Sequence, residues 1–202
     1  MIVDSPPRFR SNGRSAAVIE NHPGAERPKS GKAADYRLST LHDQLFLPSV
    51  SETSFYKRAT FVTHLPTECL YSPSHFWLHE IEPGRWRVGF TKFATRMLGE
   101  IVEVQWEKAE GAPVVSGEII GSIEGFKAIS DIYCVASGAF AGGNSALRQD
   151  IELVSREPYG GGWLYEIQGQ PDAKCIDLAA YRALLDATID RILEKQQAEE
   201  AE

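Results

Sequence analysis

The amino-acid sequence predicts a mostly β fold with small helices, a flattened β-barrel or sandwich of two related halves with a C-terminal helix. Three observations lead to this prediction. From Phe61 onward, short apolar runs alternate with turn residues, which is typical of β-rich domains. The motif Val114–Glu118 recurs in reduced form at Val135–Ala139, which indicates two similar half-units. From Asp177, apolar residues recur at helical spacing.

The chain divides into three segments by composition. Residues 1–60 are expected to be a largely disordered N-terminal extension, because prolines and scattered polar residues leave little apolar surface to offset the entropy of ordering. Leu45, Phe46 and Phe55 lie near its end, and the sequence does not decide whether they contact the body. Residues 61–175 form the predicted domain, and residues 176–202 a C-terminal helix with an acidic tail.

Charge and composition exclude several classes of protein. The net charge of −7 is uneven: residues 1–60 carry +3 and residues 61–202 carry −10. An acidic body argues against nucleic-acid binding, which needs clustered Lys and Arg, and favours a basic protein partner. No apolar run approaches the length of a membrane span. Three scattered cysteines predict neither a disulfide framework nor a zinc site, so a cytoplasmic setting is expected.

The first elements of the predicted domain have clear local signals. Phe76–Leu78 and Trp86–Phe90 flank the turn-forming Glu82–Gly84, which predicts a hairpin. Thr91 is suited to cap a short helix over residues 92–98, because its hydroxyl can accept a bond from a free amide of the first turn.

The later elements follow from the same reasoning. Gly99 fits the position just past the end of the short helix. Residues 101–106 alternate as a strand, and Asn144–Val154 predicts a second short helix or turn. The C-terminal helix has one apolar face, made of Leu178, Tyr181, Leu185, Ile189 and Ile192.

The recurring motif directs attention to one lysine. Gly117 and Gly138 occupy equivalent places in the two copies, and each is expected in a tight turn that feeds a strand. Lys127 lies midway between them, so we expect it at the tip of an exposed hairpin that links the halves. A lysine on a rigid turn suits acylation, because its primary amine is a nucleophile on a long stem. Taken alone, however, a lysine at a hairpin tip is usually an ordinary solvated charge.

The residues around this lysine resemble a known family. Glu124–Tyr133 is similar to the lipoylation segment of glycine-cleavage H proteins, with Glu three places before the modified lysine and Ser-Asp-Ile-Tyr shortly after it. The likeness covers about residues 62–190. Further similar motifs are His75–Trp77, Val88–Thr91, Leu98–Val102, Glu152–Val154, Pro158–Leu164 and Tyr181–Leu185.

The resemblance implies a hybrid-motif fold of the lipoyl- and biotinyl-carrier type and a carrier subunit without catalytic residues of its own. Lys127 would hold lipoate in amide linkage, and Glu124 would be recognised by the lipoate-attaching enzyme. Asp131 and Tyr133 would shape the hairpin. The other candidate site residues are the neighbours of the lysine, Gly125, Phe126 and Ala128.

The resemblance also implies partners. The arm would take an aminomethyl group from glycine decarboxylase and pass it to a folate-dependent aminomethyltransferase, linking glycine catabolism to one-carbon metabolism. Dihydrolipoamide dehydrogenase, a flavoenzyme, would then reoxidise the dithiol.

Three departures from the family pattern leave alternatives open, and one of them is that the N-terminal tail and the extended C-terminal helix exceed the usual compact carrier. Gly125-Phe126 stands where the family usually has Ser-Val, and Cys134 follows Tyr133 where Ser or Ala is common. Cys134 is therefore a candidate redox residue. The sequence also resembles H-like lipoate-binding proteins that carry sulfur for a heterodisulfide-reductase-like complex in sulfur oxidation. A non-lipoylated interaction module on the same fold is a third alternative, whereas biotin carriers usually have methionines beside the lysine.

No other motif predicts catalysis or metal binding. His75 and His79 flank an aromatic run expected to be a strand, where they would lie on one face but far apart. Gly160–Gly162 lacks the Lys-Ser/Thr of a phosphate-binding loop and is expected to allow a sharp turn before Trp163.

Overall fold

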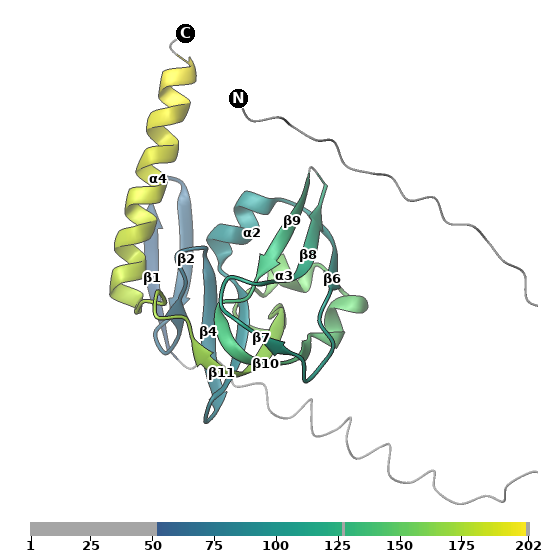
Figure 1. Cartoon of the computed structure of the whole chain (residues 1–202). Coiled ribbons are helices and arrows are strands. Elements are labelled where there is room, and N and C mark those ends of the chain that lie inside the picture. The colour runs from purple at the N-terminus through teal and green to yellow at the C-terminus, as the bar shows by residue number, and fades with distance from the viewer. Residues whose placement is uncertain (1–51, 127, 201–202) are drawn as a thin grey trace, which may run out of the picture. The chain divides into compact units, whose positions relative to one another are not determined.

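Two antiparallel sheets face each other across an apolar core (Figure 1). The computed structural model describes residues 52–126 and 128–200. The larger sheet contributes Leu78 and Val88 to the core and the smaller one Ile120 and Ile123, each at most 1% exposed. The sheets do not close into a barrel, so the fold is the sandwich form of the predicted architecture.

The larger sheet contains the predicted hairpin. β4 (Phe76–Glu82) and β5 (Arg85–Phe90) pair around the Pro83-Gly84 turn, where Gly84 has a φ of 73°. A positive φ of this size favours glycine, so the turn prediction is confirmed. The strand order is β3-β4-β5-β11-β10-β7, and the remaining strands are β3 (Leu70–Tyr71), β7 (Pro113–Val114), β10 (Ala136–Gly143) and β11 (Tyr165–Pro171).

The smaller sheet has the order β6-β8-β9, from β6 (Ile101–Trp106), β8 (Ile119–Gly125) and β9 (Ala128–Tyr133). The tight turn expected before a strand is found in the first copy of the recurring motif, where Gly117 has a φ of 84° just before β8. The expected turn at Gly138 is wrong, because this residue lies within β10. A Cβ at Gly138 would approach the Gln168 oxygen of β11 to 2.1 Å, so glycine serves close strand contact there.

The helices confirm the local signals. α2 (Lys92–Leu98) begins after Thr91, whose side chain accepts a bond from the Ala94 amide, and ends at Gly99 with a φ of 77°. The segment Asn144–Val154, expected to hold one short helix or turn, contains η1 (Ser145–Arg148) and the start of a second helix, α3 (Leu153–Arg156). The C-terminal helix is α4 (Leu178–Glu200).

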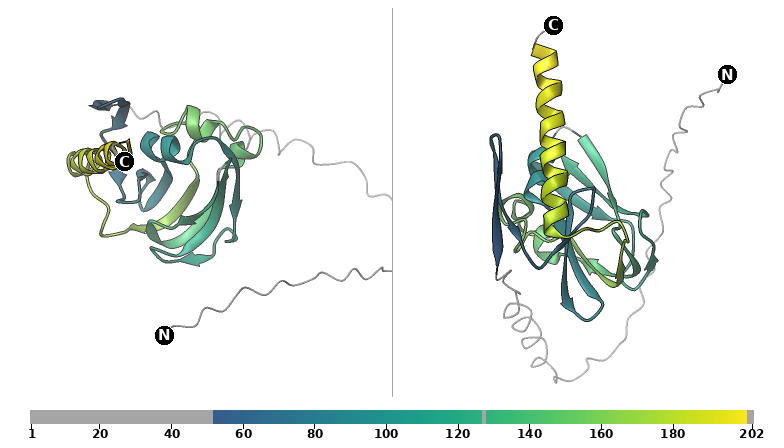
Figure 2. Two further views of the ribbon diagram at one scale, coloured as in Figure 1. Left: turned by 90° about the horizontal axis from the view of Figure 1, so that it is seen from above. Right: turned by 90° about the vertical axis from the view of Figure 1, so that its left-hand side faces the viewer.

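A separate hairpin of β1 (Thr53–Arg58) and β2 (Phe61–Pro66) lies beside α4 (Figure 2). The hydroxyl of Tyr56 donates to Asp186 at 2.8 Å, and Arg58 Nε donates to Asp190 at 2.9 Å. These contacts anchor β1 to residues far along the chain, so the described end of the predicted extension, residues 52–60, is ordered. The expectation for the rest of the extension stays a prediction. Residues 1–51 lie outside the described residues.

Candidate functional site at the β8–β9 hairpin

The candidate site is the turn between β8 and β9. The register pairs Gly125 with Ala128, so only Phe126 and Lys127 stand between the paired strands. Lys127, the predicted acylation site, lies outside the described residues. The Phe126 amide donates a 2.9 Å hydrogen bond to the carbonyl oxygen of Glu100, just before β6. The chain leading into the lysine is therefore fixed to the neighbouring strand.

The side chains around the turn are exposed and apolar. Phe126 is 79% exposed and Ile129 is 70% exposed, so neither packs into the core. The Phe126 side chain therefore points to solvent. Two large apolar side chains beside a lysine on a projecting turn suit contact with another protein more than internal stability.

The outer face of the hairpin is acidic. Glu124 pairs in register with Ile129 on one side and with Glu103 of β6 on the other, and both carboxylates are exposed. Asp131 lies on the same face and accepts a 3.3 Å hydrogen bond from the Tyr133 hydroxyl. Like charges on facing strands repel each other, which a basic partner would relieve. Three of the predicted site residues, Glu124, Asp131 and Tyr133, are thus brought together.

Cys134 follows the hairpin but lies inside the body. Its thiol is 1% exposed and donates to the Ala136 carbonyl oxygen at 3.0 Å. Burial raises the pKa of the Cys134 thiol, which disfavours the thiolate needed for disulfide exchange. This placement argues for a packing role and against the redox role considered from the sequence.

The described residues offer no second reactive centre at the hairpin. No group of three or more His, Cys, Asp or Glu in the described part of the chain is arranged to hold a metal ion. His75 instead lies 3.0 Å from the Tyr181 hydroxyl, and burial lowers its pKa to about 4. The arrangement at the hairpin, with Phe126 and Ile129 exposed next to carboxylates, is suited to contact with other proteins.

Comparison with known proteins identifies the family. Residues 69–187 match the family model described as glycine cleavage H-protein. The chain belongs to the glycine cleavage H-protein family. Glycine cleavage system H proteins of Corynebacterium jeikeium and of an Escherichia coli strain are each 38% identical to it. They align over 60% and 62% of this chain and 98% of each relative.

A solved structure agrees with this assignment. The crystal structure of a glycine cleavage system H protein from Mycobacterium marinum superposes with a TM-score of 0.54 at 31% identity, covering 59% of this chain and 97% of that one. The family match begins after β2, so the β1–β2 hairpin precedes the H-protein region. None of the described helices is long and apolar enough to cross a membrane.

Two features of the site were missed from the sequence. The carbonyl of Glu100 anchors the turn, and Glu103 extends the acidic face across β6. Regular strand alternation would place Glu103 on the same face as the buried Ile101. The register shift between these two residues turns Glu103 to the outer face, and the sequence gives no sign of that shift. A backbone acceptor such as the Glu100 carbonyl has no side-chain signal at all.

Proposed function

We propose that this chain is a lipoyl carrier of the glycine cleavage system, with lipoate attached to Lys127. The observation that carries the proposal is the two-residue turn, held to the Glu100 carbonyl through Phe126 and bordered by paired strands. A lysine between the ends of two paired strands would be accessible to an attaching enzyme.

The attached group would supply a distal disulfide that accepts and releases the aminomethyl unit derived from glycine. The chain's own residues orient and expose that group. Glu124 and Asp131 provide a negative surface for the attaching enzyme and for glycine decarboxylase, the folate-dependent aminomethyltransferase and dihydrolipoamide dehydrogenase. Phe126 and Ile129 provide apolar contact beside the arm.

The family match supports glycine cleavage over a sulfur-carrying route, and the burial of Cys134 gives no reason to prefer the latter. The decisive experiment is peptide mass spectrometry across Lys127 on protein purified from its own cells. A lipoyl adduct confined to Lys127 is expected. An unmodified lysine, in cells whose other lipoyl proteins are fully modified, would instead mean that the fold serves as an unmodified interaction module.

The pathway is tested separately with glycine decarboxylase. The lipoylated protein should support exchange of bicarbonate with the glycine carboxyl group, whereas Lys127→Arg, which keeps the charge but cannot be lipoylated, should not. Lipoylated protein without exchange activity would keep the carrier role and reject the glycine-cleavage assignment.

A further inference from the structure

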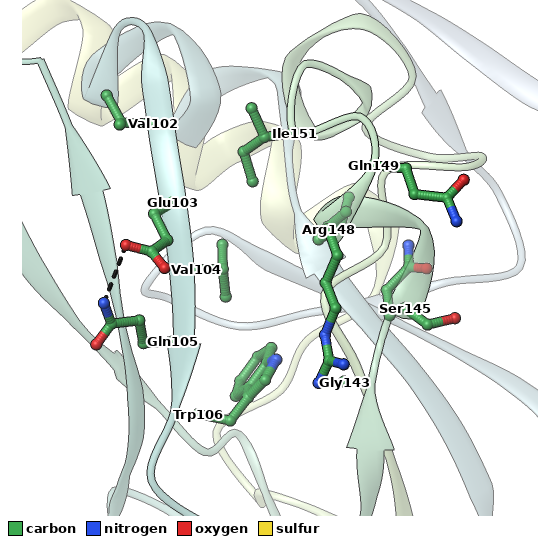
Figure 3. A pocket seen from close by; sticks show the side chains of 12 residues that line it. Val102, Glu103, Val104, Gln105, Trp106, Gly143, Ser145, Arg148, Gln149 and Ile151 are labelled. Atoms are coloured by element: carbon green, nitrogen blue, oxygen red, sulfur yellow. Dashed lines mark hydrogen bonds between the residues drawn. The ribbon is translucent and has the colours of Figure 1, made fainter.

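A groove of about 860 Å³ runs along β6 on the side away from β8 (Figure 3). One wall is β6 itself, from Val102 to Trp106, and the other is the segment from Gly143 to Ile151, which includes η1. The groove is distinct from the turn that holds Lys127, and none of the site residues discussed above except Glu103 lines it.

The β6 wall is a free sheet edge. β6 is an outermost strand of the smaller sheet, and its only neighbour in that sheet is β8. Just past the end of β6, the Glu107 amide donates a 2.9 Å hydrogen bond to the Ile120 carbonyl oxygen of β8. Backbone bonds alternate along an antiparallel pair, so Glu103 and Gln105 also face β8. The backbone amides and carbonyls of Val104 and Trp106 therefore face the groove. No backbone group in the described ranges pairs with them.

The floor of the groove is apolar and rigid. The Trp106 ring packs 5.4 Å from Phe140 and 5.7 Å from Tyr165, centroid to centroid. It also covers Gly143, where a Cβ would come within 2.0 Å of the indole nitrogen. Leu147 is buried beside it. A preformed apolar floor beside a free strand edge is suited to side chains that alternate along an extended peptide.

Two charged side chains line the groove, Glu103 and Arg148, and both are exposed. Glu103 accepts a 3.0 Å hydrogen bond from Gln105 Nε2, so its carboxylate has a partner, and Arg148 is the charge left to bind a ligand. Its side chain extends between η1 and β6 toward Trp106 (Figure 3). Within residues 52–126 and 128–200 it makes no hydrogen bond or ion pair, whereas Arg85, Arg87 and others are paired with carboxylates. An unpaired guanidinium in a partly enclosed groove favours a carboxylate, which it can bind through two parallel hydrogen bonds.

We propose that this groove binds an extended, acidic segment of a partner protein, which adds as a fourth strand to the free edge of β6. A carboxylate of the segment pairs with Arg148, and its backbone bonds to Val104 and Trp106. A peptide fits better than a compact ligand, because the six residues of β6 offer an edge of roughly 20 Å at ~3.3 Å per residue. The proposal does not depend on lipoate at Lys127, so either can fail alone.

The test uses the full chain and a set of capped, fluorescent peptides of about eight residues, enough to span β6. Each alternates Val and Thr and carries one Glu at a different position, and each has a twin with Lys in place of Glu. At least one Glu peptide should bind, its Lys twin should bind roughly tenfold more weakly, and amide hydrogen exchange at Val104 and Trp106 should slow.

Two variants and a control decide the mode of binding. Arg148→Glu should reverse the preference from the Glu peptide to its Lys twin. Val104→Pro removes an amide that faces the groove without removing a bond to β8, and should weaken both peptides. Lys174→Glu, an exposed charge reversal outside the groove, should change neither. Binding to none of the peptides, or binding that Arg148→Glu leaves unchanged, would overturn the proposal even if Val104→Pro failed to fold.

Discussion

The backbone amide of Phe126 donates a 2.9 Å hydrogen bond to the carbonyl oxygen of Glu100, although the Phe126 side chain is 79% exposed. The residue before the candidate lysine is therefore held by its backbone and not by its ring. This arrangement separates two roles at one position: the amide fixes the turn, and the ring is available to a partner.

Replacing Phe126 tests the two roles separately. Phe126→Pro removes the donor and leaves the Glu100 carbonyl without its partner, which should cost about 1 kcal/mol and loosen the turn. Phe126→Ala keeps the amide and removes only the ring. We expect the proline variant to be lipoylated more slowly by the attaching enzyme than the alanine variant, measured by intact-protein mass spectrometry over time. Equal rates for the two variants would show that the anchor is dispensable.

The buried Glu166 is expected to be a major determinant of stability. Its carboxylate is 5% exposed and accepts bonds from Arg85 at 2.6 and 2.9 Å and from Arg87 at 2.7 and 3.0 Å. Glu166→Gln leaves two guanidinium groups without their anion, and should lower the free energy of unfolding by about 2–4 kcal/mol, less than a fully buried pair because Arg85 is partly exposed.

Urea unfolding measures this effect, with Asp150→Asn as the control. Asp150 pairs with Arg156 on the surface, where solvent screens the interaction, so its loss should change the midpoint little. Similar midpoints for the two variants would contradict the assigned importance of the buried cluster.

The stability of the protein should fall between pH 6.5 and about 4 because of His75. Burial lowers the pKa of His75 to about 4, while an unfolded histidine titrates near 6.5. In this window the unfolded chain binds a proton that the folded chain does not, so stability decreases as pH falls, by up to about 3 kcal/mol. Urea midpoints measured across this range should show that slope.

His75→Asn provides the control for the pH dependence. Asn tolerates the positive φ of 65° at this position and does not titrate. The variant should have a flatter dependence of its urea midpoint on pH above about 4, whatever its absolute stability. A slope identical to that of the parent protein would assign the effect to other groups.

Local signals in the sequence predicted much of the sandwich. The Pro83-Gly84 turn, the Thr91 cap and the helical spacing after Asp177 each depend on neighbouring residues, and each is confirmed. The hairpin in which Gly125 pairs with Ala128 also followed from the recurring motif, whereas the turn expected at Gly138 was wrong. Lys127 itself lies outside the described residues.

The β1–β2 hairpin could not be predicted in the same way. Only Tyr56 is buried within β1, so the strand has no apolar alternation of its own, and its anchors Asp186 and Asp190 are about 130 positions away. Burial that depends on such distant contacts leaves no local pattern. The position of Cys134 is a similar case, since Tyr165, a hydrogen-bond partner of its thiol, comes from β11.

The glycine run before Trp163 yields the last prediction, because its members differ sharply in their surroundings. A Cβ at Gly162 would lie 2.1 Å from the Leu153 carbonyl oxygen and 2.8 Å from the Val154 Cα, both backbone atoms of α3. A Cβ at Gly160 would meet nothing closer than 3.8 Å. Gly162→Ala must therefore push the turn away from α3, whose Val154 is fully buried in the core.

We expect Gly162→Ala to lower the free energy of unfolding by about 2–3 kcal/mol, as overpacking of rigid backbone does. The melting temperature should fall by roughly 5–10 °C in a chain of this size. Gly160→Ala should stay within about 0.5 kcal/mol of the parent, since its new methyl group enters ordinary van der Waals space. Differential scanning calorimetry of the two variants measures both values. Equal melting temperatures would mean that the turn and α3 separate readily, and that close packing at Gly162 does not hold them together.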